Sequence, residues 1–165
     1  MNPRAIILAL FCAMAAVTGA QPLPEKADSI LILKKEHLLE LRAHGRVIRM
    51  YRVALGQGGL APKERQGDAR TPEGHYAISA RYAASEYHRA LQISYPNAED
   101  RRRAARLGAQ PGGQIMIHGL PNGKGWVGAS HRLHDWTLGC IAVTDPEIEE
   151  IWALVPLGTP VEIRP

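Results

Sequence analysis

Aromatic residues and cysteine are both scarce in this chain. Phe, Tyr and Trp together make up 5% of its 165 residues, and only Cys12 and Cys140 carry a thiol. The shortage of aromatic side chains disfavours the stacking surfaces on which single-stranded nucleic acids bind. Two cysteines are too few for a disulfide-rich scaffold. The absence of a glycine period, of a sustained heptad and of internal repeats excludes collagen-like, coiled-coil and repeat folds.

Charge of one sign is not concentrated enough to indicate a nucleic-acid partner. The net charge is +4 and the isoelectric point is about 9.3, but the basic residues cluster only at Arg101, Arg102, Arg103 and Arg106. DNA-binding proteins usually present a basic face, whereas this cluster is typical of the solvated side of a helix. The mild positive charge suits loose attraction to an anionic wall or membrane surface. With 45% hydrophobic residues, the chain is expected to fold as one globular domain.

The first 20 residues have the pattern of a secretory signal peptide. A positive charge at Arg4 precedes an apolar run from Ala5 to Val17, and the small residues of 18–20 follow it. That run is too short to span a bilayer comfortably, so we expect export without stable membrane insertion. The predicted organisation is a signal peptide over 1–20, a short linker over 21–28 and one domain over 29–165.

Strands dominate the predicted secondary structure. Short runs rich in aliphatic and β-branched residues, separated by glycine and charged residues, are typical of strands. They cover residues 29–33, 38–42, 47–53, 74–82, 90–95, 115–118 and 161–163. With no alternation of strand and helix, the sequence predicts a mainly β fold, a sandwich or small barrel, with two short helices.

The two helices and two long loops complete this organisation. Residues 97–107 have Asn97 as a possible N-cap, and the second helix is expected to start with Asp145 as its N-cap and to end near Leu154. Residues 56–72 are rich in glycine, proline and charge, which is typical of a functional loop. Residues 119–136 have no clear period and are expected to form an irregular loop around a site.

Cys140 and His118 are a candidate catalytic pair. After export, Cys140 would be the only thiol, and such a thiol is inert, paired with another chain, or reactive. Attack by cysteine on a carbonyl needs a base, and His118 lies at the end of a predicted strand, where it could take and return the proton. Gly139 allows the sharp turn that would expose the sulfur. From spacing alone, a buried structural cysteine is as well supported as a catalytic one.

Two motifs resemble the signature of a known family. Residues 117–119 (Ile-His-Gly) and 137–141 (Thr-Leu-Gly-Cys-Ile) are similar to the His-Gly and Ser/Thr-x-Gly-Cys motifs of the L,D-transpeptidase catalytic domain, the YkuD-like family. Residues 70–76 resemble its Thr-Pro-x-Gly segment, residues 94–97 the stretch before its variable insertion, and residues 144–151 its acidic helix. The resemblance extends from about residue 29 to 163 and implies the fold of this family.

The resemblance implies a role for each matching residue. Cys140 corresponds to the nucleophile, His118 to the general base and acid, and the Gly119 carbonyl to the group that orients the imidazole. Thr137 and Gly139 would shape the pocket and its oxyanion site.

Other residues between or near these motifs are candidate substrate contacts. We expect Trp136 to line a binding groove or to hold the glycine-rich loop, His134 to touch substrate, and Tyr95 to be structural or to line the pocket. Leu138 and Ala142 stand where many family members have His and a cation or amide, so the usual grip on an acidic substrate group is weakened. This Thr-Leu-Gly-Cys pattern resembles members that act on wall attachments or hydrolyse existing links.

The reaction that the resemblance implies is acyl transfer on peptidoglycan stem peptides. Cys140 would attack the bond between the L-centred diamino acid and D-alanine, and D-alanine would leave. An amine acceptor would then capture the thioester to give a crosslink or a protein attachment, whereas water would give hydrolysis. No metal or other cofactor is implied, and the expected protein is a monomer in the periplasm or at the cell wall.

Two alternatives from other function classes stay open at this point. His118, His131, His134 and Cys140 could form a zinc site of a metal-dependent wall hydrolase, although their spacing fits no familiar closed site. A peptidoglycan-binding module without turnover is the second alternative. The presence of both Cys140 and His118 argues against it.

Overall fold

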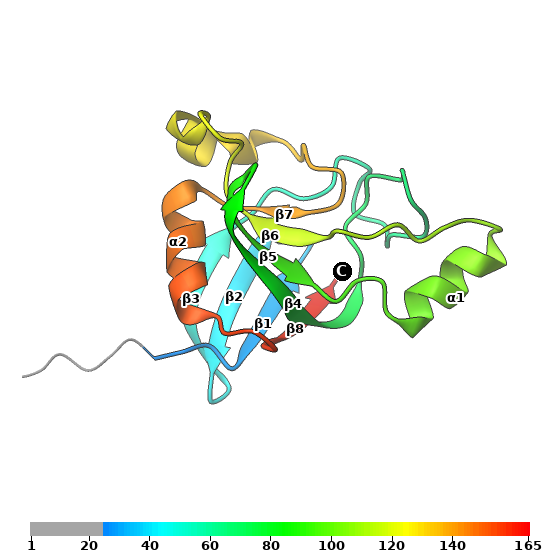
Figure 1. Ribbon diagram of the computed structural model, residues 1–165, viewed down its shortest axis with the longest axis horizontal. Helices are drawn as coiled ribbons and strands as arrows, with labels where there is room; N and C mark the ends of the chain where they lie inside the picture. The colour runs from blue at the N-terminus through cyan, green and yellow to red at the C-terminus, as the bar shows by residue number, and fades with distance from the viewer. Residues whose placement is uncertain (1–24) are drawn as a thin grey trace, which may run out of the picture.

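One bent sheet forms the framework of the protein. The computed structural model describes residues 25–165, so the predicted signal peptide lies outside the described residues. Among these residues, eight strands form a single sheet in the order β3-β2-β1-β8-β4-β5-β6-β7 (Figure 1). The strands are β1 (Ser29–Leu33), β2 (Leu38–Ala43), β3 (Arg46–Arg52), β4 (Gly74–Ser85), β5 (His88–Ile93), β6 (Met116–His118), β7 (Ile141–Ala142) and β8 (Pro160–Arg164).

Strand β4 joins the two halves of the sheet. Its first residues, Gly74 to Ala77, pair antiparallel with β8, and the rest pair antiparallel with β5. The chain after β3 also reaches the opposite edge strand, because Ala54 forms an antiparallel bridge with Ala142 of β7. This bridge brings the two ends of the strand order together, which gives the sheet a barrel-like closure.

Inward-facing side chains of alternate strand residues fill the interior. Ile30 and Ile32 of β1 face inward, as do Leu39 and Leu41 of β2, with at most 1% of each residue exposed. Because successive side chains of a strand point to opposite faces, this pattern directs one face of β1 and one of β2 to the core. Burial of each large aliphatic side chain contributes roughly 1.5–3 kcal/mol to the free energy of folding.

Three helical segments accompany the sheet, one more than the sequence predicted. They are α1 (Ala98–Arg106), a 3-10 segment η1 (Gly125–Leu133) and α2 (Asp145–Leu154). Helices α1 and α2 lie at opposite ends of the long axis (Figure 1). The mainly β class is confirmed, but η1 lies where the sequence predicted only irregular loop, because glycine-rich 3-10 turns have no apolar period to reveal them.

The helix caps agree with the sequence at α1 and differ at α2. The Asn97 side chain accepts hydrogen bonds from the backbone N–H of Glu99 and Asp100, as an N-cap does. At α2 the N-cap is Thr144 and not Asp145, and Glu147 accepts hydrogen bonds from both the backbone N–H and the hydroxyl of Thr144. This capping box fixes where the chain leaves β7.

The segment predicted as a linker already belongs to the packed domain at its end. Ala27 is 2% exposed, and its backbone N–H donates to the carbonyl of Leu154 at 2.9 Å. The backbone N–H of Asp28 donates to the carbonyl of Arg42. Residues 27 and 28 are therefore docked to α2 and β2, because their backbone groups find partners there.

The loop of residues 56–72 is fixed at its base by a buried lysine. Lys34 is fully buried, forms an ion pair with Glu73 at 2.8 Å, and donates to the carbonyls of Thr71 and Ala61 at 3.0 and 3.2 Å. Burial lowers the pKa of this ammonium, and the Glu73 carboxylate opposes the shift. All three protons of the ammonium have acceptors, so residues 61 and 71 of the loop are held beside the end of β1.

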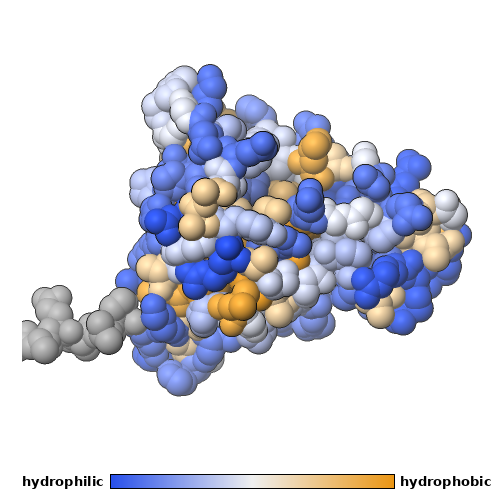
Figure 2. All heavy atoms as spheres, in the orientation of Figure 1, coloured by the Kyte–Doolittle hydropathy of each residue, from blue (hydrophilic) through white to orange (hydrophobic). Residues whose placement is uncertain are grey.

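On the face of the protein in Figure 2, hydrophobic residues lie in small, separate patches among hydrophilic ones. Within residues 25–165, none of the helices combines the length and the apolar character that crossing a membrane requires.

Candidate active site

Strands β6 and β7 bring His118 and Cys140 to the same face of the sheet. Ile117 pairs in parallel with Ile141, and both are completely buried in the core. Because side chains alternate along a strand, His118 and Cys140 point to the opposite face from these two isoleucines. The register sets Cys140 beside Met116, so the Cα atoms of Cys140 and His118 are about 8 Å apart by standard strand spacings.

Both side chains line one large cavity. Its volume is about 990 Å³. One wall comes from the 56–72 loop and residues 112–114, and another from the β4–β5 hairpin. Cys140 is half-buried, whereas His118 is 4% exposed. A substrate in this cavity would contact a thiol and an imidazole held on rigid, neighbouring strands.

The imidazole of His118 is fixed in one tautomer. Its Nδ1 lies 2.7 Å from the carbonyl oxygen of Gly119, so Nδ1 carries the proton and Nε2 is the free acceptor. Tyr87 packs against the ring with centroids 4.5 Å apart, and Trp136 contacts its edge at 5.9 Å. Burial lowers the pKa of His118, and the Gly119 carbonyl opposes this only in part. The ring is therefore a neutral base near pH 7.

Gly119 has to be glycine for a packing reason. A Cβ at this position would lie 2.8 Å from Oδ1 of Asp145, which already accepts the backbone N–H of Leu120. The backbone N–H of Gly119 lies 3.2 Å from the carbonyls of Tyr87 and Arg89. The carbonyl beside His118 Nδ1 is thus held by both the β5 side and the start of α2.

The thiol of Cys140 is protonated in the resting protein. Burial raises its pKa, while the backbone N–H of Met116 and the positive charge of Lys63 act in the opposite direction. Its Sγ lies 3.5 Å from the carbonyl oxygen of Gln114, a weak thiol hydrogen bond. A neutral thiol next to a neutral imidazole needs proton transfer during attack. It is not a preformed thiolate–imidazolium pair, in which a charged imidazole would lower the thiol pKa.

Thr137 closes the turn that presents Cys140. Its hydroxyl donates to the carbonyl of Cys140 at 2.8 Å and accepts the backbone N–H of Gly139 at 3.1 Å. Gly139 has φ +129°, in the region that side chains rarely adopt. The amide of Gly139 is thereby committed within the turn, so Gly139 shapes this turn and its N–H is not free for the oxyanion role that the resemblance implied.

Gly139→Ala is expected to disrupt this turn. An added Cβ would lie 2.7 Å from the Arg70 carbonyl oxygen and 3.1 Å from Ile115, and the strained backbone conformation alone costs about 1–3 kcal/mol. Urea unfolding should show a loss of at least about 2 kcal/mol. Gly113→Ala is the matched control, because it lines the same cavity and a Cβ there meets nothing within 4 Å. Equal stability of the two variants would contradict this account.

The other predicted substrate contacts are only partly brought to the cavity. Trp136 lines it and donates its indole N–H toward Nδ1 of His131 at 3.3 Å. His134 is exposed and lines a separate cavity of about 260 Å³. Tyr95 lies outside both of these cavities: it is 4% exposed, and its hydroxyl donates to the carbonyl of Pro111 at 2.8 Å. A core position with a satisfied hydroxyl makes Tyr95 a packing residue.

The described part of the chain contains no set of ligands for the zinc site of the alternative hypothesis. No group of three or more His, Cys, Asp or Glu side chains within residues 25–165 lies close enough together to hold a metal ion. His131 faces the indole of Trp136, and burial lowers its pKa to about 4. His134 points to solvent, so the four residues of the predicted zinc site do not converge.

The candidate residues from the sequence did not include several side chains around the thiol and imidazole. Tyr87, Lys63 and Gln114 are examples that line the cavity. Tyr87 and Lys63 lie far from the motifs in sequence and have no local signature. Gln114 has φ +56°, and only the Gly112-Gly113 pair before it signals an unusual backbone there. These residues reach the site through pairing between distant segments.

Comparison with known proteins places the chain in a family. The sequence profile of the L,D-transpeptidase catalytic domain (YkuD) matches residues 27–163. YafK of Escherichia coli (strain K12), whose name assigns it to the L,D-transpeptidases, is 32% identical over 132 residues, which are 76% of this chain and 46% of YafK. The chain thus spans about half the length of the curated relatives it matches.

Solved structures show the same fold. The helical cell shape determining protein Pgp2 from Campylobacter jejuni aligns with a TM-score of 0.62 at 24% identity, over 82% of this chain and 46% of Pgp2. An L,D-transpeptidase from Xylanimonas cellulosilytica aligns with a TM-score of 0.56 at 19% identity, over 87% of this chain and 63% of that one. Because the profile match covers nearly all described residues, this chain belongs to the L,D-transpeptidase catalytic domain (YkuD) family.

Proposed function

We propose that the protein is an exported, cysteine-dependent acyltransferase or hydrolase acting on peptidoglycan stem peptides. The observation that carries this proposal is the shared cavity of Cys140 and His118, with the Nδ1 proton of His118 directed at the Gly119 carbonyl. A relative named as an L,D-transpeptidase and a structural neighbour named for determining cell shape both support a substrate in the cell wall. Export rests on the predicted signal peptide of residues 1–20.

In the proposed reaction, His118 acts first as a base and then as an acid. Its Nε2 takes the thiol proton while Sγ of Cys140 attacks the carbonyl of the L-centred diamino acid. The peptide C–N bond breaks, and His118 returns the proton to the amine of the leaving D-alanine. The thioester keeps the energy of the acyl bond until a second nucleophile arrives, so the reaction needs no other energy source.

The fate of the thioester defines the activity. An amine at the acyl carbon forms a new amide, either a crosslink or a protein attachment, and water releases the free acid. Leu138 lines the cavity but is 73% exposed, so its apolar side chain does not keep water from the acyl group. The masses of the products therefore distinguish amine capture from hydrolysis.

Mass spectrometry of the intact protein tests the proposal. Incubation with a stem tetrapeptide should add the mass of the tripeptide acyl group to the peptide that contains Cys140, and D-alanine should appear in solution. Muropeptides from wall digests should then gain crosslinked or amine-linked masses if an amine captures the thioester, and should yield free tripeptides if water does. Protein alkylated beforehand at Cys140 is the control. If no acyl adduct forms and the muropeptide profile is unchanged, the proposed function is wrong.

A further inference from the structure

Lys63 is a cation in the wall of the cavity and lies outside the motifs identified in the sequence. It comes from the loop of residues 56–72, is 4% exposed and lines the same cavity as Cys140. Only Glu86 among the other residues lining this cavity is an acid, and it belongs to the β4–β5 hairpin. The charge of Lys63 acts on the sulfur, since it lowers the pKa of the Cys140 thiol against the effect of burial.

The ammonium of Lys63 is held in place by two acceptors. Its Nζ donates to Oδ1 of Asp68 at 2.7 Å and to the carbonyl of Arg65 at 3.0 Å. An ammonium has three protons, so one remains for a further acceptor. Asp68 lies behind this ammonium and is not among the residues that line the cavity.

The Asp68 carboxylate is shared between the Lys63 ammonium and backbone N–H groups of the loop. Its carboxylate accepts the backbone N–H groups of Glu64, Arg65 and Arg70 at 2.8, 3.0 and 3.1 Å. Burial raises the pKa of Asp68, but these amides and the Lys63 ammonium outweigh it and lower the pKa to about 2. Three amides share this carboxylate with the ammonium, and of the two charged groups it is Lys63 whose charge acts on the Cys140 thiol.

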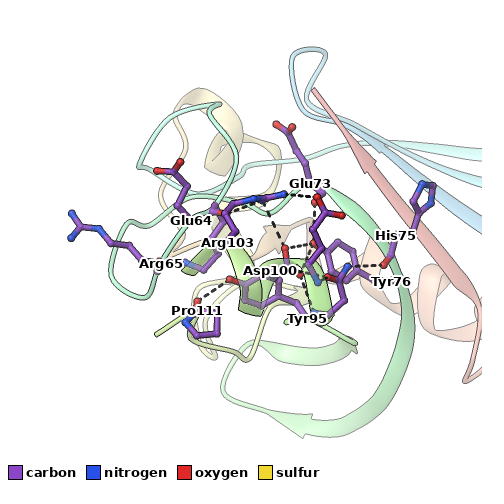
Figure 3. A network of polar contacts seen from close by, with 12 residues as sticks. Glu64, Arg65, Glu73, His75, Tyr76, Tyr95, Asp100, Arg103 and Pro111 are labelled. Carbon is purple, nitrogen blue, oxygen red and sulfur yellow. Dashed lines mark hydrogen bonds and ion pairs between the residues drawn. The ribbon is translucent and has the colours of Figure 1, made fainter. Parts of the chain in front are cut away.

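Helix α1 braces the segment that carries this lysine. Arg103 donates to the carbonyl of Lys63 at 3.3 Å and lies 3.9 Å from Asp100, which accepts the hydroxyl of Tyr76 (Figure 3). On the other side, the backbone N–H of Gln66 donates to the carbonyl of residue 110 at 2.7 Å. Because this lysine is already held in place, binding a ligand costs little further side-chain entropy. Such preorganisation favours ligand recognition.

We infer that Lys63 is the cation of a carboxylate-binding subsite next to Cys140. It supplies, from another loop, the positive charge that is missing at Ala142, which is fully buried in β7. The ligand class is a peptide with a free carboxylate near its scissile bond. The assignment of that peptide as a wall stem rests on the proposed function, but the charge at the sulfur does not.

Alkylation of Cys140 with two reagents measures this charge without any turnover. Iodoacetate is an anion and iodoacetamide is neutral, and each transfers its methylene carbon to sulfur with loss of iodide. The rate ratio of the anion to the neutral reagent, followed on the peptide containing Cys140, should exceed that of a free thiol. Lys63→Met should lower the ratio about fivefold, the order expected for one nearby charge in a partly solvated site.

The controls separate charge from damage to the loop. Lys63→Arg should keep the ratio within about twofold, and Lys35→Met, which removes an exposed lysine elsewhere, should leave it unchanged. A folded Lys63→Met protein with an unchanged ratio would overturn the inference. If Lys63→Met does not fold, the wild-type ratio decides: a value at or below that of the free thiol overturns it, and a higher value supports it.

Substrate analogues test the same subsite in the reaction. Amidation of the recognised carboxylate of a stem tetrapeptide should raise KM about tenfold in the wild type and have no effect in Lys63→Met. Separate amides of the terminal and the side-chain carboxylate identify which one binds. Equal sensitivity to amidation in both proteins would contradict the inference. A different outcome separates the two claims. If the protein is inactive toward all peptides but its alkylation ratio exceeds that of a free thiol, the proposed function is refuted and the subsite is supported.

Discussion

Cys140→Ala should give a folded protein that forms no acyl adduct and loses at least about 10⁴-fold in turnover, as expected when the nucleophile of a covalent mechanism is removed. Sγ makes only a weak hydrogen bond to the Gln114 carbonyl, so loss of the sulfur should change stability by about 1 kcal/mol. Turnover of stem peptides and thermal unfolding measured on the same preparation separate these two effects.

The second cysteine provides the matched control for this substitution. Cys12→Ala removes the same atom within the predicted signal peptide and should leave turnover by the exported protein unchanged. Retention of wild-type turnover by Cys140→Ala would rule out the thioester mechanism. A large loss of stability in Cys140→Ala would assign the cysteine to the core, which is the structural reading that the sequence left open.

His118→Gln should reduce turnover by about 10²–10⁴-fold, the usual contribution of a general base. Gln keeps a side-chain donor for the Gly119 carbonyl but cannot accept the thiol proton and return it. Tyr87 and Trp136 should still pack around position 118. His44→Gln is the control, because the His44 side chain is 81% exposed and lies in the turn between β2 and β3. Equal turnover of the two variants would contradict the role of His118.

The pH dependence of the wild type follows from the same two groups. Burial lowers the pKa of His118 below its ordinary value of 6.5 and raises that of Cys140 above 9.0. The base is active only when neutral, so kcat/KM should rise with pH through a value below 6.5 and then stay level past neutrality. A thiolate–imidazolium pair would instead lose its imidazolium with rising pH. An alkaline limb near pH 7 would therefore contradict the neutral pair.

The burial of His118 also makes stability depend on pH. Because the folded-state pKa is below the unfolded one, the unfolded chain binds more protons between these two values. The free energy of unfolding should therefore fall as the pH drops below 6.5. His118→Gln should show a smaller fall over the same range.

Local patterns were sufficient to predict most elements of the fold. The short aliphatic runs of β1 and β2 are bounded by charged and turn residues, and the Asn97 cap of α1 is a local hydrogen-bonding device, so each can be recognised without knowledge of its partner. Segment η1 could not be recognised, because a 3-10 turn among glycines has no apolar face. The pairing of β1 with β8 in parallel, across most of the chain, also has no local signal.

The candidate site could likewise be predicted only in part from local patterns. The His-Gly and Thr-x-Gly-Cys motifs mark Cys140 and His118 because both lie at the ends of strands, where the chain itself fixes their direction. For Tyr95 the sequence left a structural role and a pocket role open. Its hydroxyl is satisfied by Pro111, a partner that proximity in sequence does not reveal.

By itself, the sequence determined the class of fold, the strand that ends at the imidazole, and the family. Tertiary structure alone decided the protonation of these two groups and the charge around them. Whether a thiol is ionised depends on desolvation and on charges several ångströms away. Here those charges come from Lys63, some 77 positions before the sulfur, and only the folded loop brings them into the same cavity.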